Sequence, residues 1–152
     1  MRHTLAEIEV GAVLADDVRV YQFATILAGT SIGAGSVVGA NSWIGRNCRI
    51  GRNVRIQTGV VIPHGTVIED DVFIGPNVTM TDDKSPRAGR AYTPLPPTIR
   101  RGASLAAGAI VFPGVEIGAD VMVAAGAVVH RSIPANSLVI GRGMAVPNER
   151  SA

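Results

Sequence analysis

An apolar position recurs at every sixth residue along most of the chain. Starting from Ile8, thirteen members spaced six residues apart are all aliphatic or methionine, and the series ends at Met80. A small or β-branched residue stands two positions before most members, and glycine often follows directly. After one interruption the series resumes at Ile99, Leu105, Val111, Ile117, Val123 and Val129. This period matches neither a helix of 3.6 residues per turn nor the two-residue alternation of a single strand.

A six-residue period fits a short strand followed by a turn. Three such units make a triangular coil of 18 residues, and successive coils stack as parallel strands about 4.8 Å apart. The aliphatic and the small residue of each unit point inward, while Gly and Asn supply the turn conformations. The pattern predicts one all-β domain over 1–152, a parallel β-helix with coils at about 8–80 and 98–134 and a C-terminal tail at 135–152. Cys48 occupies an inward small-residue slot, so we interpret it as a packing residue.

The repeat is broken once, between Met80 and Ile99. The step there is 19 residues instead of six, so 13 residues are inserted, and the segment 82–97 holds four of the nine prolines. We expect an inserted loop at about 81–97 that leaves the coil. An insertion into a strict repeat generally marks the binding face; a tolerated surface excursion is the alternative.

Residues 18 apart should stack on successive coils, which places Ala28, Arg46, His64 and Asp82 in one column. His64 then lies one coil, about 5 Å in backbone terms, from the base of the loop. A histidine beside a carboxylate is a general-base arrangement, because the carboxylate orients the ring. A solvated turn histidine beside a chance acidic pair, Asp82 and Asp83, is the competing interpretation. Arg46 is placed to meet a diphosphate, with an ordinary surface arginine as the alternative.

Composition and charge exclude several classes of partner. The 14 basic and 12 acidic residues nearly balance, which suggests neither a nucleic-acid nor a membrane partner. No run approaches the roughly 18 apolar residues of a membrane span, and the N-terminus has no apolar signal-peptide region, so we expect a cytoplasmic protein. The single cysteine rules out an internal disulfide framework. His3 and His130 are far from His64 in the repeat, so we expect no three-histidine zinc site and no metal.

Four segments carry a family resemblance. Residues 56–87, reading IQTGVVIPHGTVIEDDVFIGPNVTMTDDKSPR, resemble bacterial nucleotide-sugar N-acetyltransferases of the left-handed β-helix superfamily, in particular those that acetylate the C3 amino group of a UDP- or dTDP-linked amino sugar. Tyr21-Gln22-Phe23 is similar to their N-terminal W-x-F pattern. RRGASLAAGAIVFPGVEIG and MVAAGAVVHRSIPANSLVIG are similar to the acetyl-CoA-binding coils of the superfamily. The resemblance spans residues 18–142 and implies a left-handed helix.

The resemblance implies an acceptor site at the loop. The family motif there is T-N-D-x-Y-P-R: Asp82 stands where Asn is usual, Asp83 matches, Ser85 replaces the aromatic residue, and Pro86 and Arg87 match. It implies that Asp82 or Asp83 holds the sugar amine and that Arg87 and Tyr21 bind substrate. His64 stands where some relatives carry Glu and would accept the amine proton; in some members the coenzyme A sulfur is thought to accept it instead.

The same resemblance implies acetyl-CoA as co-substrate. Ala107 and Ala125, again 18 apart, lie in A-A-G runs whose backbone would bind the pantetheine arm, and their small side chains permit close approach. Arg142 matches a basic residue near the coenzyme phosphates, with an exposed structural arginine as the alternative. The usual G-N-P-A ending is replaced here by Gly-Arg-Gly-Met at 141–144.

Superfamily members are trimers with each active site between two β-helices. The outward apolar residues Val37, Trp43, Val61 and Phe73 fit a homotrimer, since they exceed what a monomer should expose. Two other function classes stay open. One is an acetyltransferase for another small acceptor, such as a hydroxyl group; the other is a non-catalytic β-helix that serves as a binding module.

Overall fold

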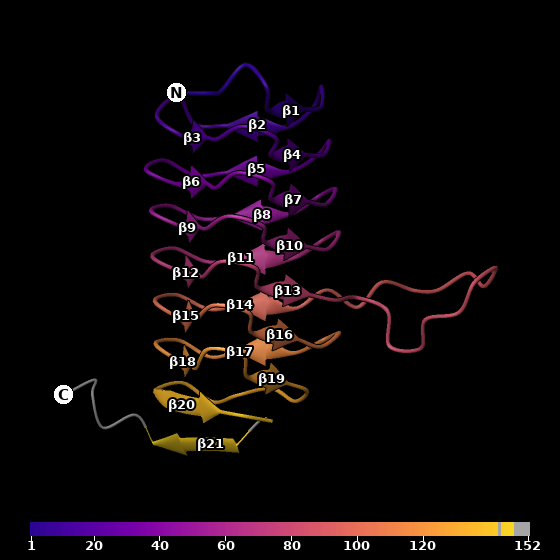
Figure 1. The fold of residues 1–152 in the computed structure, drawn as a ribbon, viewed down its shortest axis with the longest axis vertical. Coiled ribbons are helices and arrows are strands. Elements are labelled where there is room, and N and C mark those ends of the chain that lie inside the picture. The colour runs from indigo at the N-terminus through magenta and orange to yellow at the C-terminus, as the bar shows by residue number, and fades with distance from the viewer. Residues whose placement is uncertain (143, 148–152) are drawn as a thin grey trace.

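The computed structural model describes residues 1–142 and 144–147 and shows a prism of stacked coils with three faces (Figure 1). The described residues contain strands and no helix, so the all-β parallel β-helix predicted from the repeat is confirmed. Nearly every strand is two residues long and ends on the apolar member of its six-residue unit.

The three faces follow one another along each coil. The first face holds β1 (Glu7–Ile8), β4 (Thr25–Ile26), β7 (Trp43–Ile44), β10 (Val61–Ile62), β13 (Thr79–Met80), β16 (Ile110–Val111) and β19 (Val128–Val129). The second face holds β2 (Val13–Leu14), β5 (Ser31–Ile32), β8 (Arg49–Ile50), β11 (Val67–Ile68), β14 (Thr98–Ile99) and β17 (Glu116–Ile117). The third face holds β3 (Arg19–Val20), β6 (Val37–Val38), β9 (Arg55–Ile56), β12 (Phe73–Ile74), β15 (Ser104–Leu105), β18 (Met122–Val123), β20 (Ser137–Ile140) and β21 (Met144–Pro147).

The strand register is the one that 18-residue stacking requires. Ile26 pairs with Ile44, and Ile68 pairs with Ile99 across the insertion, so the coil resumes in phase after the loop. The C-terminal end differs from the prediction. Residues 137–140, which we assigned to a tail, form β20 and pair in parallel with β18, and β21 returns antiparallel to β20. The β-helix therefore continues past residue 134.

The core is a column of aliphatic side chains lined by small ones. The inward residues are almost completely buried, and the inward hydroxyls are satisfied by the backbone: Thr30 Oγ1 donates to the Gly45 carbonyl at 2.7 Å and accepts the Cys48 N–H at 3.1 Å. Cys48 is buried, as predicted, and burial raises the pKa of its thiol above the usual value. Its protonated thiol faces the Pro63 carbonyl at 3.2 Å.

Three corners join the faces, and two of them matter for function. We call the turns from the first to the second face, such as 63–66, the first corner, and the turns from the third to the first face, such as 57–60, the third corner. The turns use left-handed backbone conformations, for example at Asn47 (φ 57°) and Gly65 (φ 74°) in the first corner. The inserted segment 81–97 leaves the first corner as an arm that projects well beyond the prism (Figure 1).

Candidate active site

A hollow of about 360 Å³ lies at the base of the arm, on the first corner. It brings together residues that the 18-residue register predicted to be neighbours, His64 from one coil and Asp82 and Asp83 from the next. On the side of the first face the hollow is lined by Trp43, Val61 and Met80. The lining residues are Trp43, Val61, Pro63, His64, Thr79, Met80, Thr81, Asp82, Asp83, Pro86 and Tyr92.

The His64 ring is held on two sides. Its Nδ1 accepts the backbone N–H of Arg46 at 2.7 Å, and its ring meets Trp43 edge to face, with centroids 5.3 Å apart and planes at 72°. Asp70 makes the same kind of contact at the next corner, where its Oδ1 accepts the Arg52 N–H at 2.8 Å. His64 therefore fills a position that elsewhere in the coil belongs to a hydrogen-bond acceptor.

This contact bears on the predicted general-base role of His64. A neutral imidazole has one donor and one acceptor nitrogen. With Nδ1 accepting the Arg46 N–H, the ring proton resides on Nε2, and taking up a second proton would cost that hydrogen bond. No hydrogen bond joins His64 to Asp82 or Asp83 among the contacts described for this chain. The geometry thus favours Nε2–H as a donor over a base oriented by a carboxylate.

The two carboxylates are tied into the arm instead. Asp82 Oδ2 accepts the Tyr92 hydroxyl at 3.3 Å, and the Asp82 carbonyl accepts the Leu95 N–H at 2.8 Å, which closes the base of the arm. The negative charge of Asp82 raises the pKa of Tyr92 above its usual value, so the phenol stays a donor. Asp83 Oδ1 accepts the Ser85 N–H at 2.8 Å.

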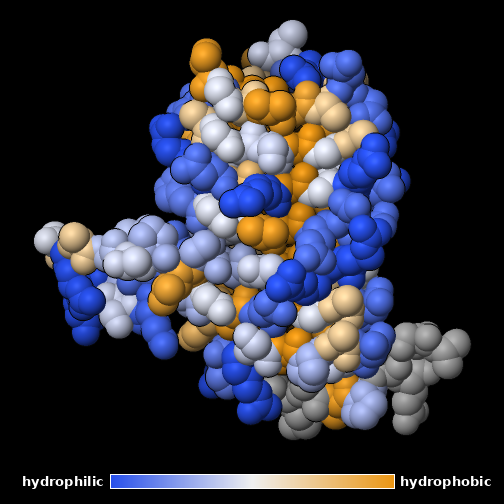
Figure 2. All heavy atoms as spheres, turned by 180° about the vertical axis from the view of Figure 1, so that it is seen from behind, coloured by the Kyte–Doolittle hydropathy of each residue, from blue (hydrophilic) through white to orange (hydrophobic). Residues whose placement is uncertain are grey.

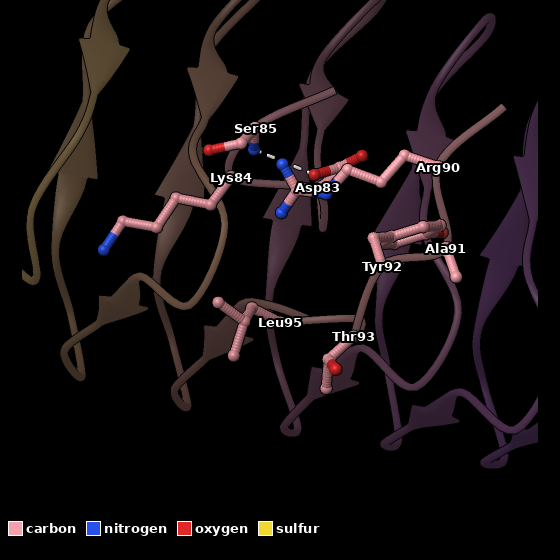
Figure 3. Close-up of a pocket in the computed structure, with 8 residues that line it drawn as sticks. All are labelled: Asp83, Lys84, Ser85, Arg90, Ala91, Tyr92, Thr93 and Leu95. Atoms are coloured by element: carbon pink, nitrogen blue, oxygen red, sulfur yellow. Dashed lines mark hydrogen bonds between the residues drawn. The ribbon is translucent and has the colours of Figure 1, made fainter. Parts of the chain in front are cut away.

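The arm folds back on itself around a second hollow of about 470 Å³ (Figure 3). Its outgoing limb contributes Asp83, Lys84 and Ser85, and its returning limb contributes Arg90, Ala91, Tyr92, Thr93 and Leu95. Arg87 lies near the tip, exposed, with its guanidinium donating to the Pro86 carbonyl at 3.4 Å.

Arg46 belongs to the column but has a partner of its own. Its guanidinium forms a salt bridge with Glu9 at 3.0 Å, and its side chain is 52% exposed. The sequence predicted either a diphosphate contact or an ordinary surface arginine. The observed pair favours the second, because a ligand would have to compete with Glu9.

Two of the three predicted cofactor residues lie on a different corner. Ala107 and Ala125 are exposed on the third corner, stacked so that the Gly126 N–H donates to the Ala107 carbonyl at 2.9 Å. Tyr21 belongs to the same corner, near the N-terminal end. Arg142 follows β20 and lines an apolar hollow of about 580 Å³ together with Ile110, Phe112, Val128 and His130. Within one chain, His64 and the arm are therefore separated from Ala107 and Ala125 by the width of the first face, whereas Arg142 lies beside residues of that face.

The four outward apolar residues singled out in the sequence differ in how exposed they are. Val61 and Phe73 are 37% and 39% exposed, and Trp43 is half-buried against His64. The Val37 side chain is nearly buried, with 9% of its surface exposed, because it lies between Arg19 and Arg55 on the third face. An apolar band runs along the prism beside the base of the arm (Figure 2). Ile110 of the first face and Phe112 of the first corner add to the exposed apolar surface, at 37% and 43%.

The sequence profiles of two hexapeptide repeats match most of the coil. The "bacterial transferase hexapeptide (six repeats)" profile matches residues 11–46 and 47–82, and the "hexapeptide repeat of succinyl-transferase" profile matches residues 102–131. The chain belongs to the hexapeptide-repeat transferases, and its architecture is consistent with their left-handed β-helix. The match to the first profile ends at Asp82 and the match to the second begins at Gly102, so all of the arm after Asp82 lies outside both of them.

Individual relatives are acetyltransferases or candidates for that activity. A candidate acetyltransferase of Schizosaccharomyces pombe is 38% identical over 76 residues, which cover 46% of this chain and 36% of that protein. A hexapeptide-repeat acetyltransferase of Vibrio cholerae, solved with acetyl coenzyme A, has a TM-score of 0.64 at 28% identity and covers 78% of this chain and 68% of its own. A mutant perosamine N-acetyltransferase of Caulobacter crescentus, solved with CoA and GDP-perosamine, has a TM-score of 0.50 at 26% identity and covers 90% and 53%.

A candidate acetyltransferase of Bacillus cereus shares the fold alone. Its TM-score is 0.76 at 22% identity, over 95% of this chain and 84% of that chain. The present chain thus spans about a third of the curated yeast relative and about half of the Caulobacter enzyme. Within residues 1–142 and 144–147, no helix is long and apolar enough to cross a membrane, and no three His, Cys, Asp or Glu side chains gather as a metal site would require.

Proposed function

We propose that this protein is an acetyl-CoA-dependent N-acetyltransferase that acts on the amino group of a nucleotide-linked sugar, in particular the C3 amine of a UDP- or dTDP-sugar. The observation that carries the proposal is the hollow beneath the arm, which sets His64 beside Asp82 and Asp83. The hexapeptide profiles and the Vibrio acetyltransferase solved with acetyl coenzyme A support the acyl donor. The Caulobacter enzyme solved with GDP-perosamine supports a nucleotide amino sugar as acceptor.

The chemistry is attack of the sugar amine on the thioester carbonyl. A carbon–nitrogen bond forms, the carbon–sulfur bond breaks, and the proton lost by nitrogen ends on the departing sulfur, which gives the amide and coenzyme A. Asp82 and Asp83 hold the amine. His64, fixed through Nδ1 by the Arg46 N–H, donates from Nε2 to the carbonyl oxygen as negative charge develops on it.

A homotrimer completes the site. Since the first corner carries His64 and the arm while the third corner carries Ala107, Ala125 and Tyr21, the first corner of one copy must meet the third corner of another. The projecting arm and the exposed apolar side chains of the first face supply a surface for that contact. Arg87 on the arm and Arg142 near the coenzyme then act on ligands held between two copies.

The test is a thiol-release assay with acetyl-CoA against UDP-, dTDP- and GDP-linked amino sugars. Each amino sugar is paired with the corresponding hydroxy sugar, so that O-acetylation is scored separately. We expect release with an amino sugar and a product that is an amide by mass and by NMR. Release only with hydroxyl acceptors would replace the proposal by an O-acetyltransferase. A chain that binds acetyl-CoA in calorimetry with no acceptor turnover would favour another acceptor, and one that binds no acetyl-CoA would favour a non-catalytic module.

A further inference from the structure

A third hollow, of about 390 Å³, lies on the third face and third corner in the N-terminal half of the prism. It contains Tyr21, to which the resemblance assigns substrate binding, but its charge comes from two arginines to which the resemblance assigns no role. Arg19 and Arg55 belong to β3 and β9, the two strands that flank β6. Because neighbouring strands are about 4.8 Å apart, their backbones are about 10 Å apart, with Val37 between them.

The lining of this hollow is rich in donors and free of acid. Besides the two guanidinium groups it includes the amides of Gln22 and Gln57 and the hydroxyl of Thr58, and none of its lining residues is Asp or Glu. Three other arginines on the prism are neutralised by carboxylates: Arg46 by Glu9, Arg100 by Glu69 and Glu116, and Arg101 by Asp70 and Asp71. Arg49 and Arg52 have no ion pair among the described residues, but neither lines this hollow. Among the described residues, no such ion pair involves Arg19 or Arg55.

Packing explains only part of this arrangement. The arginine stems cover Val37, which is why an outward valine is only 9% exposed. Covering a valine does not require two like charges on the same side of the hollow, or an acid-free rim. A planar guanidinium recognises phosphate oxygens in a bidentate way, and two of them separated by one strand can each engage one phosphate of a pair.

We propose that Arg19 and Arg55 form a binding site for a diphosphate group. The two ligands implied by the proposed function each carry one, the nucleotide sugar and coenzyme A, and the identity of the physiological ligand rests on that function. The anion site itself does not rest on that function, because it is defined by the side chains that line the hollow and can be tested without turnover. His64 lies in the turn that follows β10, one strand along the chain from Arg55, so the diphosphate site and the hollow under the arm are at similar heights along the prism.

The experiment is calorimetric titration of the full chain with inorganic pyrophosphate, followed by competition with UDP and with coenzyme A. The variants Arg19→Met and Arg55→Met keep an apolar stem over Val37 and remove the charge. Arg49→Met is the matched control, since Arg49 holds the equivalent outward position in β8 on the second face and is also exposed. Melting temperatures of all three variants verify that the fold is kept.

We expect pyrophosphate to bind and each of the two third-face variants to weaken its binding at least tenfold, while Arg49→Met leaves it unchanged. Competition by UDP assigns the site to the acceptor nucleotide, and competition by coenzyme A assigns it to the acyl donor; either result supports the proposal. Three results overturn it: no pyrophosphate binding, equal weakening by Arg49→Met, or binding that neither UDP nor coenzyme A displaces. If pyrophosphate binds at these arginines but no amino sugar is acetylated, the proposed function fails and the diphosphate site stands.

Discussion

Substituting Gly45 by alanine should damage the site beneath the arm more than it damages the fold. Gly45 has no positive φ, so alanine is allowed there by the backbone, but its Cβ would meet the next coil. The new atom would lie 2.6 Å from His64 N and 2.8 Å from His64 Nδ1, whereas ordinary contacts begin at 3.4 Å. The turn that carries His64 must therefore yield by about 0.8 Å.

The magnitude follows from this displacement. Overpacking of this kind costs about 1–3 kcal/mol of unfolding free energy. A misplacement near 1 Å in a catalytic constellation can lower the rate about 100-fold, so we expect Gly45→Ala to lower kcat roughly 10- to 100-fold. The assay is thiol release at saturating acetyl-CoA and acceptor, with unfolding free energy measured by urea titration.

Gly51→Ala is the matched control. It occupies the same place in the next unit, and its Cβ would lie 2.7 Å from Asp70 N, so the steric problem is nearly the same. Asp70 is on the second corner, away from the arm, where it pairs with Arg101. We expect a similar loss of stability and little loss of kcat. If both variants lose kcat equally, the position of His64 is not what limits the reaction, and the reasoning is refuted.

Three further outcomes follow from the structure. The ¹⁵N spectra of the His64 ring should show the proton on Nε2. His64→Gln can retain a donor at the position of Nε2 and should keep kcat within about tenfold of the unaltered enzyme, while His64→Asn should lower kcat about 100-fold or more. Equal losses of kcat in both variants would instead favour His64 as a general base. Mixing His64→Ala subunits with Ala125→Trp subunits, each inactive alone, should restore up to about a quarter of the activity after subunit exchange. The reason is that a site shared between copies can combine the intact first corner of one with the intact third corner of another. No recovery of activity in verified mixed oligomers would contradict a shared site. Hydrogen bonds from Arg100 lower the pKa of Glu69 and of Glu116 in the folded chain. The stability that these two carboxylates contribute is therefore present above their unfolded pKa near 4.3 and is lost as pH falls through the lower folded values. Urea midpoints measured from pH 7 to pH 3 should fall less for Arg100→Met than for the unaltered chain.

The six-residue repeat was sufficient to predict the fold because it constrains the backbone directly. Each inward aliphatic residue must stack on the one 18 residues away, and the observed pairs Ile26 with Ile44 and Ile32 with Ile50 follow that rule. The prediction was wrong at residues 137–140, where the spacing is irregular. Strand β20 forms there because Leu138 and Val139 still pair with Met122 and Val123 of β18.

Side-chain contacts were less predictable than backbone columns. The register placed Arg46, His64 and Asp82 in one stack, and the hollow under the arm contains the last two. It could not show which nitrogen of His64 faces the Arg46 N–H, since that depends on ring rotation. It also missed the salt bridge from Arg46 to Glu9, which reaches across two coils. Arg19 and Arg55, which are 36 residues apart, could have been found by applying the same register to the outward positions.

Most of the predicted site residues are divided between the first and the third corner of the prism. A prism of identical coils offers only shallow surfaces, because each coil buries its large side chains inside and leaves short turns at the corners. A pocket deep enough to exclude water from an acyl transfer therefore needs a second surface. The insertion supplies one part of it, since its two limbs are joined at the base by Asp82 and Leu95 and extend away from their own prism. In the proposed homotrimer, the third corner of another copy would supply the other part, with exposed alanines that let a ligand approach the backbone. On this view the repeat sets the height of each functional residue along the prism, and association of the chains brings residues of similar height together.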